Sequence, residues 1–563
     1  MQMKAFLYLS VKKMYNIRGQ CIRCTYRSVS GKAVRWRVGG MGLHKIKKAM
    51  IFFLIFWMTG CSVLQKDGTS NSENIFNSME AEPDLSYEVP VSSPNIFVNQ
   101  LGYITESTKV AVFCGKEMPE DFRVVKKDTG EIVYTGYLED KGYNEETKEY
   151  NSYGDFSEVC EPGTYYLEAS IIGRSYSFSI GDDLYDDIFK EACKQYYYNR
   201  CGMTLTQEYA SERAHNACHT GNALNREDMA VSLDVSGGWH QDETGSKIVE
   251  PVAKNIAILL LAYELYEDSF TDDIGIPESG NEIPDILDEI RYETEWLLKM
   301  QDEVTGAVYA GVTIYEQSAG RGFTAYVEPA DLETTRAFAM VLAKFSYLYQ
   351  YYDTDYATEC LKAADRAWKY AELNGKEEKD GWKFAAAAEL YRASGQQTYH
   401  KYVTDYLSTE EYGENMDEVV FLGCVTYISM KQPVNFQLCE DITKILMSKA
   451  EKVSGKSRNS IYMIGEYKEQ DNHQELLLDI MYLTMIEHMI TNHEYETIIE
   501  NHLHYLMGRN EMAICYIDNV GENNYRIIDE NLGIMNQFDA NSKLIFMLSE
   551  IVENYRSIPV IQK

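Results

Sequence analysis

The sequence of 563 residues is short of positive charge, because 53 Lys and Arg stand against 87 Asp and Glu, a formal net charge of −34. Proteins that bind nucleic acid through its phosphates need a basic face, so this balance argues against nucleic acid as the main partner. The apolar run at 49–58 has ten residues, too short for a comfortable transmembrane helix of ~20 residues. A multi-span membrane protein is therefore excluded.

The chain is rich in the residues that build cores. Hydrophobic residues make up 45% of it and aromatic residues 12%. That composition excludes a disordered or collagen-like protein. The length allows two to four ordinary domains, or one large helical domain with an accessory domain.

The N-terminal segment differs from the rest, because residues 1–60 hold twelve Lys and Arg and no acidic residue. Three lysines at 45–48 precede the apolar run, and Thr-Gly-Cys ends at Cys61. This order is typical of a secretory signal. The ending also resembles a bacterial lipoprotein signal, which would make Cys61 the lipid anchor. An ordinary signal or an uncleaved apolar anchor remains open.

This interpretation assigns 1–61 to a leader, with Met41 as the expected start of translation. Residues 62–92 are polar and acidic, with Ser, Asn and Pro, and are predicted to form a flexible tether. We therefore expect the body of the protein to be exported and held at the membrane by its lipid, on the extracytoplasmic face.

The body shows two kinds of pattern. Short apolar runs separated by turn signals predict a small β-sandwich over 93–181. Helical periodicity dominates 182–558, with no strand-rich stretch between the helices, so the fold class is mainly α and the expected architecture is six hairpins in an (α/α)6 barrel. The predicted helices are 183–199, 249–267, 282–301, 331–353, 355–374, 379–394, 397–407, 415–429, 432–452, 473–489, 491–507 and 536–556.

Several segments resemble glycoside hydrolase family 9, the family of cellulases, with an N-terminal immunoglobulin-like domain. The segments are 95–103 (NIFVNQLGY), 234–240 (DVSGGWH), 281–302, 306–309 (GAVY), 385–391 (AAAAELY) and 508–510 (GRN). The resemblance implies inverting hydrolysis of β-1,4-glucan polysaccharides. Such hydrolysis needs two carboxyl groups roughly 6.5–9.5 Å apart, one to protonate the leaving oxygen and one to activate water.

The chain departs from the family where the base is expected. After Gly-Gly-Trp, the two aspartate positions of the family fall on Gln241 and Thr244, and neither can act as a carboxylate base. Asp242 and Glu243 lie between them and are candidate replacements. The alternative is that both are solvated loop charges.

The C-terminal motif is also altered, and only Arg526 of its histidine-arginine stretch remains. This arginine is a candidate sugar contact or a structural ion pair. The position of the general acid falls on Gly533 or Met535. Glu530 is the nearest acidic residue upstream and a candidate acid, and Asp539 is a weaker one.

Two cysteines and two histidines suggest a metal site. Soft sulfur and imidazole ligands suit Zn2+, and related enzymes with the immunoglobulin-like domain carry a structural zinc in a similar order. The expected ligands are Cys201, Cys218, His219 and His240. A Cys201–Cys218 disulfide is the alternative in an exported protein. Ca2+ is a further candidate cofactor, at clusters such as 182–183 and 272–273.

Aromatic rings stack on sugars, so Trp239, Tyr309, Tyr391 and Tyr516 are together candidates to line a glycan groove, although a single such residue more often packs in the core or in a loop. We therefore expect a family 9-like hydrolase of β-1,4-glucan with an altered catalytic site. The alternative is a glycan-binding or polysaccharide-assembly protein on the same scaffold, because a fold does not fix a function.

Overall fold

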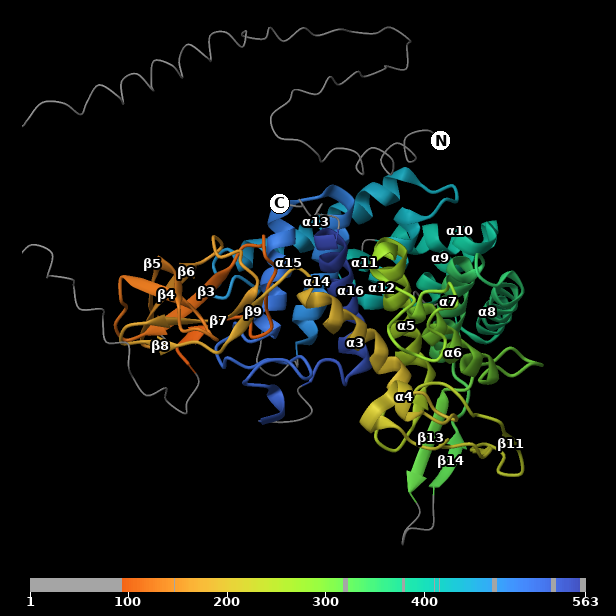
Figure 1. Cartoon of the computed structure of the whole chain (residues 1–563). Helices are drawn as coiled ribbons and strands as arrows, with labels where there is room; N and C mark the ends of the chain where they lie inside the picture. The colour runs from red at the N-terminus through yellow and green to blue at the C-terminus, as the bar shows by residue number, and fades with distance from the viewer. Residues whose placement is uncertain are drawn as a thin grey trace, which may run out of the picture. The chain divides into compact units, whose positions relative to one another are not determined.

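The computed structural model describes residues 94–145, 147–316, 323–376, 380–409, 411–414, 416–467, 473–527 and 533–556. The leader, Cys61, the tether and Glu530 lie outside the described residues. Figure 1 shows a β-rich domain followed by a helical domain. No helix in these ranges is long and apolar enough to cross a bilayer.

The β domain is a sandwich whose two layers are joined by the long strand β5. One layer has the order β1-β3-β6-β5 and the other β5-β4-β7-β9-β2, with β8 paired to β7. The core between the layers includes Phe113 and Phe122, whose ring centroids are 5.3 Å apart. The strands are β1 (Ile96–Phe97), β2 (Gly102–Tyr103), β3 (Val110–Gly115), β4 (Asp121–Lys126), β5 (Ile132–Asn144), β6 (Glu149–Asp155), β7 (Gly163–Ala169), β8 (Gly173–Arg174) and β9 (Phe178–Ile180).

Within the residues that the structure describes, the helical domain is a double ring of twelve longer helices in six hairpins, which confirms the predicted fold class. The inner helices are buried on nearly all sides, as expected for helices that fill the centre of a barrel. They are α5 (Val249–Leu265), α7 (Leu332–Tyr349), α9 (Gly381–Ser394), α12 (Glu418–Ser429), α14 (Gln474–Ile490) and α16 (Phe538–Arg556).

The outer helices bury only one face. They are α3 (Leu184–Tyr198), α6 (Asp285–Lys299), α8 (Thr354–Asn374), α10 (Gln397–Leu407), α13 (Phe436–Ser457) and α15 (His493–Leu506), and the short α4 (Gln207–Ala210) and α11 (Glu411–Glu414) lie between hairpins. Several helices begin at an aspartate cap. The side chains of Asp331, Asp380 and Asp417 each accept a hydrogen bond from the backbone three residues on, which satisfies a free N–H at the starts of α7, α9 and α12.

Ion pairs show that the inner helices run in the same direction. Near the N-terminal ends, Lys254 in the second turn of α5 contacts Glu418 of α12 and Asp539 of α16 at 2.8 and 3.0 Å. Near the opposite ends, Glu264 of α5 pairs with Arg392 of α9 at 2.8 Å. The N-termini of the inner helices therefore gather at one end of the barrel, which we call the mouth.

The prediction that no strands interrupt the helices is wrong. A five-stranded sheet of order β11-β10-β14-β13-β12 lies beside the mouth (Figure 1). Its members are β10 (Ala223–Asn225), β11 (Ser232–Leu233), β12 (Lys247–Ile248), β13 (Gly311–Glu316) and β14 (Phe323–Val327). Three of them have only two or three residues, too few to show an alternating pattern in the sequence.

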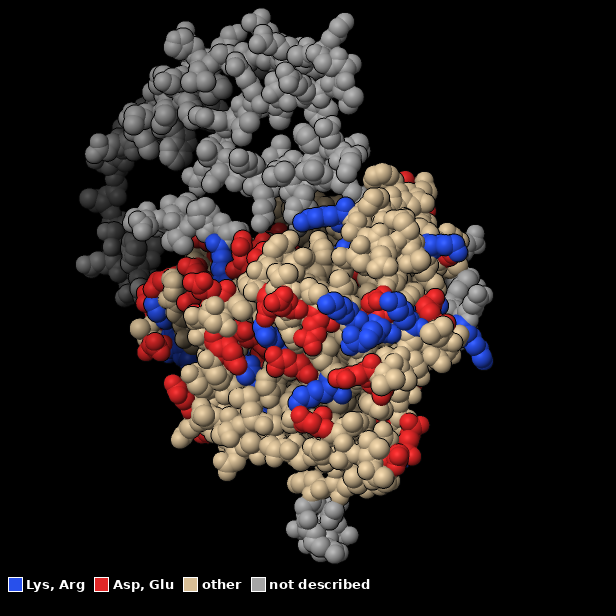
Figure 2. Space-filling model, turned by 90° about the vertical axis from the view of Figure 1, so that its right-hand side faces the viewer, with Lys and Arg blue, Asp and Glu red and all other residues tan. Residues whose placement is uncertain are grey.

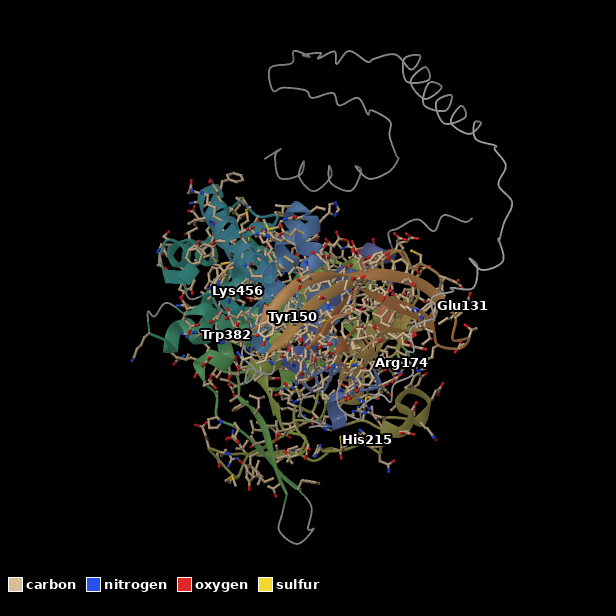
Figure 3. All side chains as sticks on the ribbon, turned by 90° about the vertical axis from the view of Figure 1, so that its left-hand side faces the viewer. Glu131, Tyr150, Arg174, His215, Trp382 and Lys456 are labelled. Atoms are coloured by element: carbon tan, nitrogen blue, oxygen red, sulfur yellow. The ribbon has the colours of Figure 1, made fainter. Side chains whose placement is uncertain are left out.

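The two domains are joined by buried polar contacts. The backbone of Gln100 donates to the Met507 carbonyl at 2.8 Å, and Arg509 donates to the Val110 carbonyl at 3.2 Å. Figure 3 views the molecule from the sandwich side, with Glu131, Tyr150 and Arg174 on the sandwich and Trp382 and Lys456 on the barrel. Because these contacts satisfy buried groups of both domains, the sandwich and the barrel pack as one unit.

Candidate functional site

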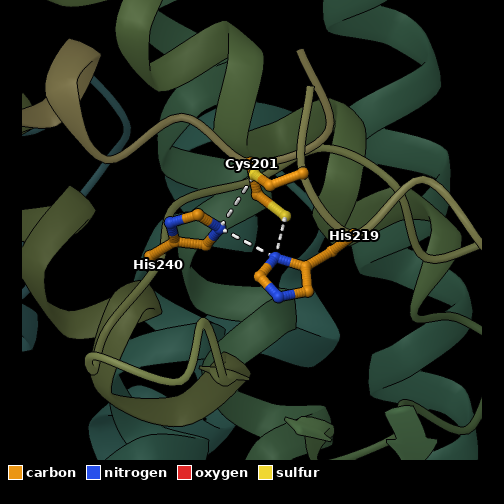
Figure 4. A group of neighbouring side chains, drawn as sticks. Cys201, His219 and His240 are labelled. Atoms are coloured by element: carbon orange, nitrogen blue, oxygen red, sulfur yellow. Dashed lines mark hydrogen bonds between the residues drawn. The ribbon is translucent and has the colours of Figure 1, made fainter. Parts of the chain in front are cut away.

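Four soft donors converge beside the barrel, as the sequence predicted. Nδ1 of His219 lies 3.3 Å from Nε2 of His240, which lies 3.4 Å from Sγ of Cys218. Sγ of Cys201 lies 3.8 Å from Nδ1 of His219. All four ligand atoms are within 4.8 Å of one another, and Figure 4 shows the ring of His219 turned toward the thiol of Cys201 and toward the ring of His240.

These spacings fit a tetrahedral metal site. With metal–sulfur bonds of about 2.3 Å and metal–nitrogen bonds of about 2.0 Å, donors of a tetrahedron lie roughly 3.3–3.8 Å apart. The three measured distances fall in that range. Cys201 and Cys218 are free thiols, so the alternative disulfide is not present. The group is therefore able to hold a metal ion.

Backbone pairing places the ligands. After α3, the N–H of Cys201 donates to the Gly238 carbonyl at 2.7 Å, and the N–H of His240 donates to the Asn199 carbonyl at 2.8 Å. Gly238 has a positive φ and lies against Trp296, where a Cβ atom would come within 2.8 Å of the ring. Glycine is therefore required for this close approach of two chain segments.

The electrostatics favour a thiolate at Cys218, whereas the hydrogen bond with Cys218 and burial raise the pKa of Cys201. Hydrogen bonds with Cys201, His219 and His240 lower the pKa of the Cys218 thiol, against the effect of burial. The buried Lys247 Nζ lies 3.6 Å from Sγ of Cys201 and donates to two loop carbonyls. A deprotonated sulfur is the form that binds metal.

The loop 240–248 is closed by its own side chains. The amide of Gln241 donates to the Ile248 carbonyl at 2.8 Å and accepts from the Ile248 N–H at 3.1 Å. Oδ1 of Asp242 accepts from the Thr244 N–H, the Thr244 hydroxyl and the Ser246 N–H at 2.7–2.9 Å. Burial would raise the pKa of Asp242, but these hydrogen bonds outweigh it and lower the pKa. Asp242 thus holds the turn together, and Glu243 is exposed.

The mouth contains a charged group that the sequence did not reveal. Lys543 is fully buried and contacts Glu418 at 2.5 Å and Asp539 at 2.7 Å. Lys254 contacts the same two carboxylates, so two lysines and two acids alternate in a closed ring. Asp539, a weaker candidate acid, is therefore neutralised on both sides. Asp539 and Lys543 are neighbours on α16, but Lys254 and Glu418 come from distant parts of the chain, so the sequence does not show that the four meet.

Glu250, in the first turn of α5, was also missed. Burial raises its pKa, Lys254 opposes that rise, and Glu333, Asp331 and Asp539 add to it. A carboxyl group that keeps its proton above the ordinary range has the property that a general acid needs. The only signal in the sequence was an acidic residue at the predicted start of a helix.

Two of the predicted groove aromatics are in the core, so those predictions are wrong. Trp239 is 0% exposed and stacks on Phe538 at 6.0 Å. Tyr391 is also fully buried, and its hydroxyl donates to the Pro433 carbonyl. Tyr309 and Tyr516 are partly buried.

Arg526 makes the structural ion pair that was its alternative role. Its guanidinium contacts the buried Asp518 at 2.6 Å, and Tyr525 and Asn536 donate to the same carboxylate. The side chain is still 47% exposed, so a donor edge remains available to a ligand.

The predicted calcium cluster at 272–273 makes other contacts. Asp272 accepts from the backbone of Gly280 and Glu282, and Asp273 pairs with Lys190 at 2.8 Å. Within the described ranges, the Cys–His group alone brings three or more potential ligands together. The described residues therefore give no support to a calcium site at 272–273.

Comparison with known proteins identifies the family. Residues 185–532 match glycosyl hydrolase family 9, and residues 91–174 match the cellulase N-terminal Ig-like domain. The chain belongs to glycosyl hydrolase family 9 and carries that accessory domain.

Curated relatives share about a quarter of their residues with the chain. Endoglucanase D of Acetivibrio thermocellus is 27% identical over 466 residues, covering 76% of this chain and 73% of that enzyme. A cellodextrinase of Butyrivibrio fibrisolvens is 27% identical over 483 residues, covering 77% and 86%. A xyloglucan-specific endo-beta-1,4-glucanase of Bacteroides ovatus is 26% identical over 489 residues, covering 76% and 80%.

Solved structures share the fold. A metagenome-derived family 9 endoglucanase superposes with a TM-score of 0.72 at 24% identity, covering 81% of this chain and 99% of that one. A Bacteroides ovatus family 9 protein gives 0.72 at 22% identity, covering 82% and 99%. A Zn-binding triple mutant of another family 9 endoglucanase gives 0.68 at 23%, covering 79% and 99%.

Proposed function

We propose that this protein binds β-1,4-glucan chains at the mouth of its barrel without the acid–base pair of ordinary family 9 hydrolysis. The observation that carries the proposal is the loop 240–248. Asp242 is the candidate base in this loop whose carboxylate is fixed, and it accepts three hydrogen bonds from its own turn. Glucan is the ligand class because the curated relatives are glucan-cleaving enzymes by name.

The chemistry of inverting hydrolysis explains why the loop matters. A base must accept a proton from the attacking water, and its loss typically costs about 10²–10⁴ in rate. The side-chain amide of Gln241 donates a hydrogen bond to the Ile248 carbonyl, and the hydroxyl of Thr244 donates one to Asp242. Neither an amide nor a hydroxyl can act as the carboxylate base. The same loop can still shape a binding site, because its fold does not depend on those aspartates.

Glu250 supports a second candidate function, hydrolysis with relocated carboxyl groups. Its raised pKa and its position in the first turn of α5 suit a proton donor. Glu333 and Asp331 lie close enough to influence its pKa and would be the partner carboxylates. Glu243 and Glu530 remain further candidates for this chemistry.

We also propose that the metal is zinc and that it is structural. Two thiols and two imidazoles are the donor set that zinc prefers, and four protein ligands close the site to substrate. The ion would fix His240 at the start of the loop. The exported, lipid-anchored state through Cys61 remains a proposal from the sequence, because that segment lies outside the described residues.

The test measures binding and cleavage together. The purified protein is titrated calorimetrically with cellotetraose and cellohexaose, and reducing ends are counted after prolonged incubation with soluble β-1,4-glucans. Asp242→Ala, Glu243→Ala, Glu530→Ala and Glu250→Gln are measured beside the unaltered protein.

We expect binding without release of reducing ends in all five proteins. Release that collapses in Glu250→Gln alone would establish the second function instead. Neither binding nor release, with any oligosaccharide or polymer, would refute both.

A further inference from the structure

The sheet beside the mouth has two different faces. The face toward the metal ligands carries Val312, Ile314, Ala325 and Val327, which are buried or partly buried. At its edge, the ring of Phe323 lies 5.8 Å from that of His219. This face lines a pocket of about 270 Å³ whose walls include Val312, Ile314, Phe323 and Ala325 of the sheet together with His219 and Lys247.

The opposite face carries aromatic rings together with hydroxyl groups. Strand register places Thr313 opposite Tyr326 and Tyr315 opposite Thr324, so these four residues share one face. The rings of Tyr315 and Tyr326 have centroids 5.8 Å apart and are inclined at 70°. Tyr315 is 54% exposed, although it lies on a sheet and not at a loop tip.

Arg226, at the end of β10, completes the arrangement. Its guanidinium lies 4.5 Å from the ring centroid of Tyr326 and 5.5 Å from that of Tyr315. Glu328 pairs with it at 2.7 Å, and it donates to the Thr313 hydroxyl at 3.1 Å. Thr313 also donates to Glu328. The arginine is therefore held in one orientation with its charge compensated.

This combination selects a neutral ligand with flat apolar faces and many hydroxyl groups. The C–H face of a pyranose ring stacks on an aromatic ring, while fixed hydroxyl and guanidinium donors reach its oxygens. A polyanion would find no uncompensated cation here, because Arg226 is already paired with Glu328. On the one face that Figure 2 shows, the lower end of the described part carries few charged side chains.

The position of the sheet relates it to the barrel mouth. β12 continues directly into α5, and β14 ends five residues before α7 begins. A polymer that leaves the mouth on this side therefore meets the sheet, whereas a short oligosaccharide need not reach it.

We propose that the outer face formed by Arg226, Thr313, Tyr315, Thr324 and Tyr326 is a second glycan-binding surface, which holds a neutral β-glucan segment that extends beyond the mouth. The proposal rests on the proposed function for the identity of the polymer. It adds a separate surface whose removal weakens binding of long chains and leaves binding of short ones unchanged.

The experiment compares a polymer with an oligosaccharide. Affinities for hydroxyethyl cellulose and for cellotetraose are measured for the unaltered protein and for Tyr315→Ala, Tyr315→Phe and Arg226→Ala. Tyr137→Ala is the matched control, since that tyrosine is 82% exposed on β5 of the sandwich. Thermal midpoints and bound metal are recorded for each protein, because the sheet covers His219.

We expect Tyr315→Ala to weaken polymer binding about fivefold, the effect of one aromatic contact, with cellotetraose binding unchanged. Tyr315→Phe retains the ring and should retain the affinity, and Tyr137→Ala should match the unaltered protein. Equal polymer affinity in Tyr315→Ala and the unaltered protein would overturn the surface while leaving the proposed function intact. Polymer binding that depends on Tyr315 without any cellotetraose binding would support the surface and refute binding at the mouth. A change in oligomeric state with unaltered polymer affinity would make the face an interface between copies and overturn the proposal.

Discussion

A cluster of buried carboxyl groups should make the stability of the barrel depend on pH. Glu487 of α14 and Glu550 of α16 are at most 8% exposed, and Glu500 of α15 lies near them. Burial, with a contribution from Glu496, raises the pKa of Glu487 from 4.5 to about 7. Burial and the three neighbouring acids raise the pKa of Glu550 well above its ordinary value.

The direction of this change in stability with pH follows from proton binding in the folded and unfolded states. Between pH 4.5 and 7 the unfolded chain has released the Glu487 proton, while the folded protein still holds it. Stability is therefore lost as pH rises through that interval, and little more is lost above it. For one group with these two pKa values, the free energy of unfolding falls by about 2 kcal/mol between pH 5.5 and 8.5.

Glu487→Gln removes this titration and keeps the shape of the side chain. Urea unfolding followed by tryptophan fluorescence at pH 5.5, 7.0 and 8.5 gives the comparison. The free energy of unfolding of the variant, relative to that of the unaltered protein, should rise by about 2 kcal/mol from the lowest pH to the highest. Glu359→Gln, on the exposed side of α8, is the control and should show no such growth. Parallel pH profiles for Glu487→Gln and the unaltered protein would refute the argument.

Three other substitutions test separate parts of the structure. Cys218→Ser should abolish stoichiometric metal binding, measured by elemental analysis after dialysis, since a tetrahedral site would lose one of its four ligands. Full metal content in that variant would contradict the assigned ligands. Lys543→Met should destabilise the protein by about 3 kcal/mol, because Glu418 and Asp539 each lose one of two cations; an unchanged urea midpoint would contradict that account of the ring. Trp239→Ala should lower the thermal midpoint strongly, at a cost of about 3–5 kcal/mol, and leave the cellotetraose affinity of the remaining folded protein unchanged. Loss of cellotetraose affinity without loss of stability would show instead that Trp239 contributes to the binding site.

The helices could be predicted well because their signals are local. The predicted 397–407 coincides with α10, and the predicted 249–267 differs from α5 by two residues at its end. Periodic apolar residues and aspartate caps such as Asp331 and Asp417 carry that information within a few turns. The four Cys and His side chains predicted to hold a metal do lie together, and the sequence pointed to them because their residue types are chemically distinctive.

The burial of Trp239 and the ring of charged residues at the mouth depend on contacts between segments that are distant in the chain. Trp239 follows two glycines, a pattern typical of an exposed loop. In the structure the ring of Phe538, about 300 residues later in the chain, stacks on it and helps to bury it. The ring of Lys254, Glu418, Asp539 and Lys543 forms only when three inner helices meet at the mouth. No pattern within one helix specifies which acid will face which lysine.

The loop and the metal site form one structural unit, and this determines which experiment can decide the function. His240 is one of the four candidate ligands and begins the loop, and Gly245 packs so closely on His219 that a Cβ atom there would come within 2.5 Å of the ring. Removing the metal should therefore loosen the loop whether the protein cleaves glucan or only binds it. Replacing a carboxyl group at Glu243 or Glu250 leaves the four candidate ligands in place and changes the available acids and bases, whereas replacing Asp242 also removes three hydrogen bonds of the turn. Those substitutions, and not chelation, separate a binding protein from a hydrolase with relocated carboxyl groups.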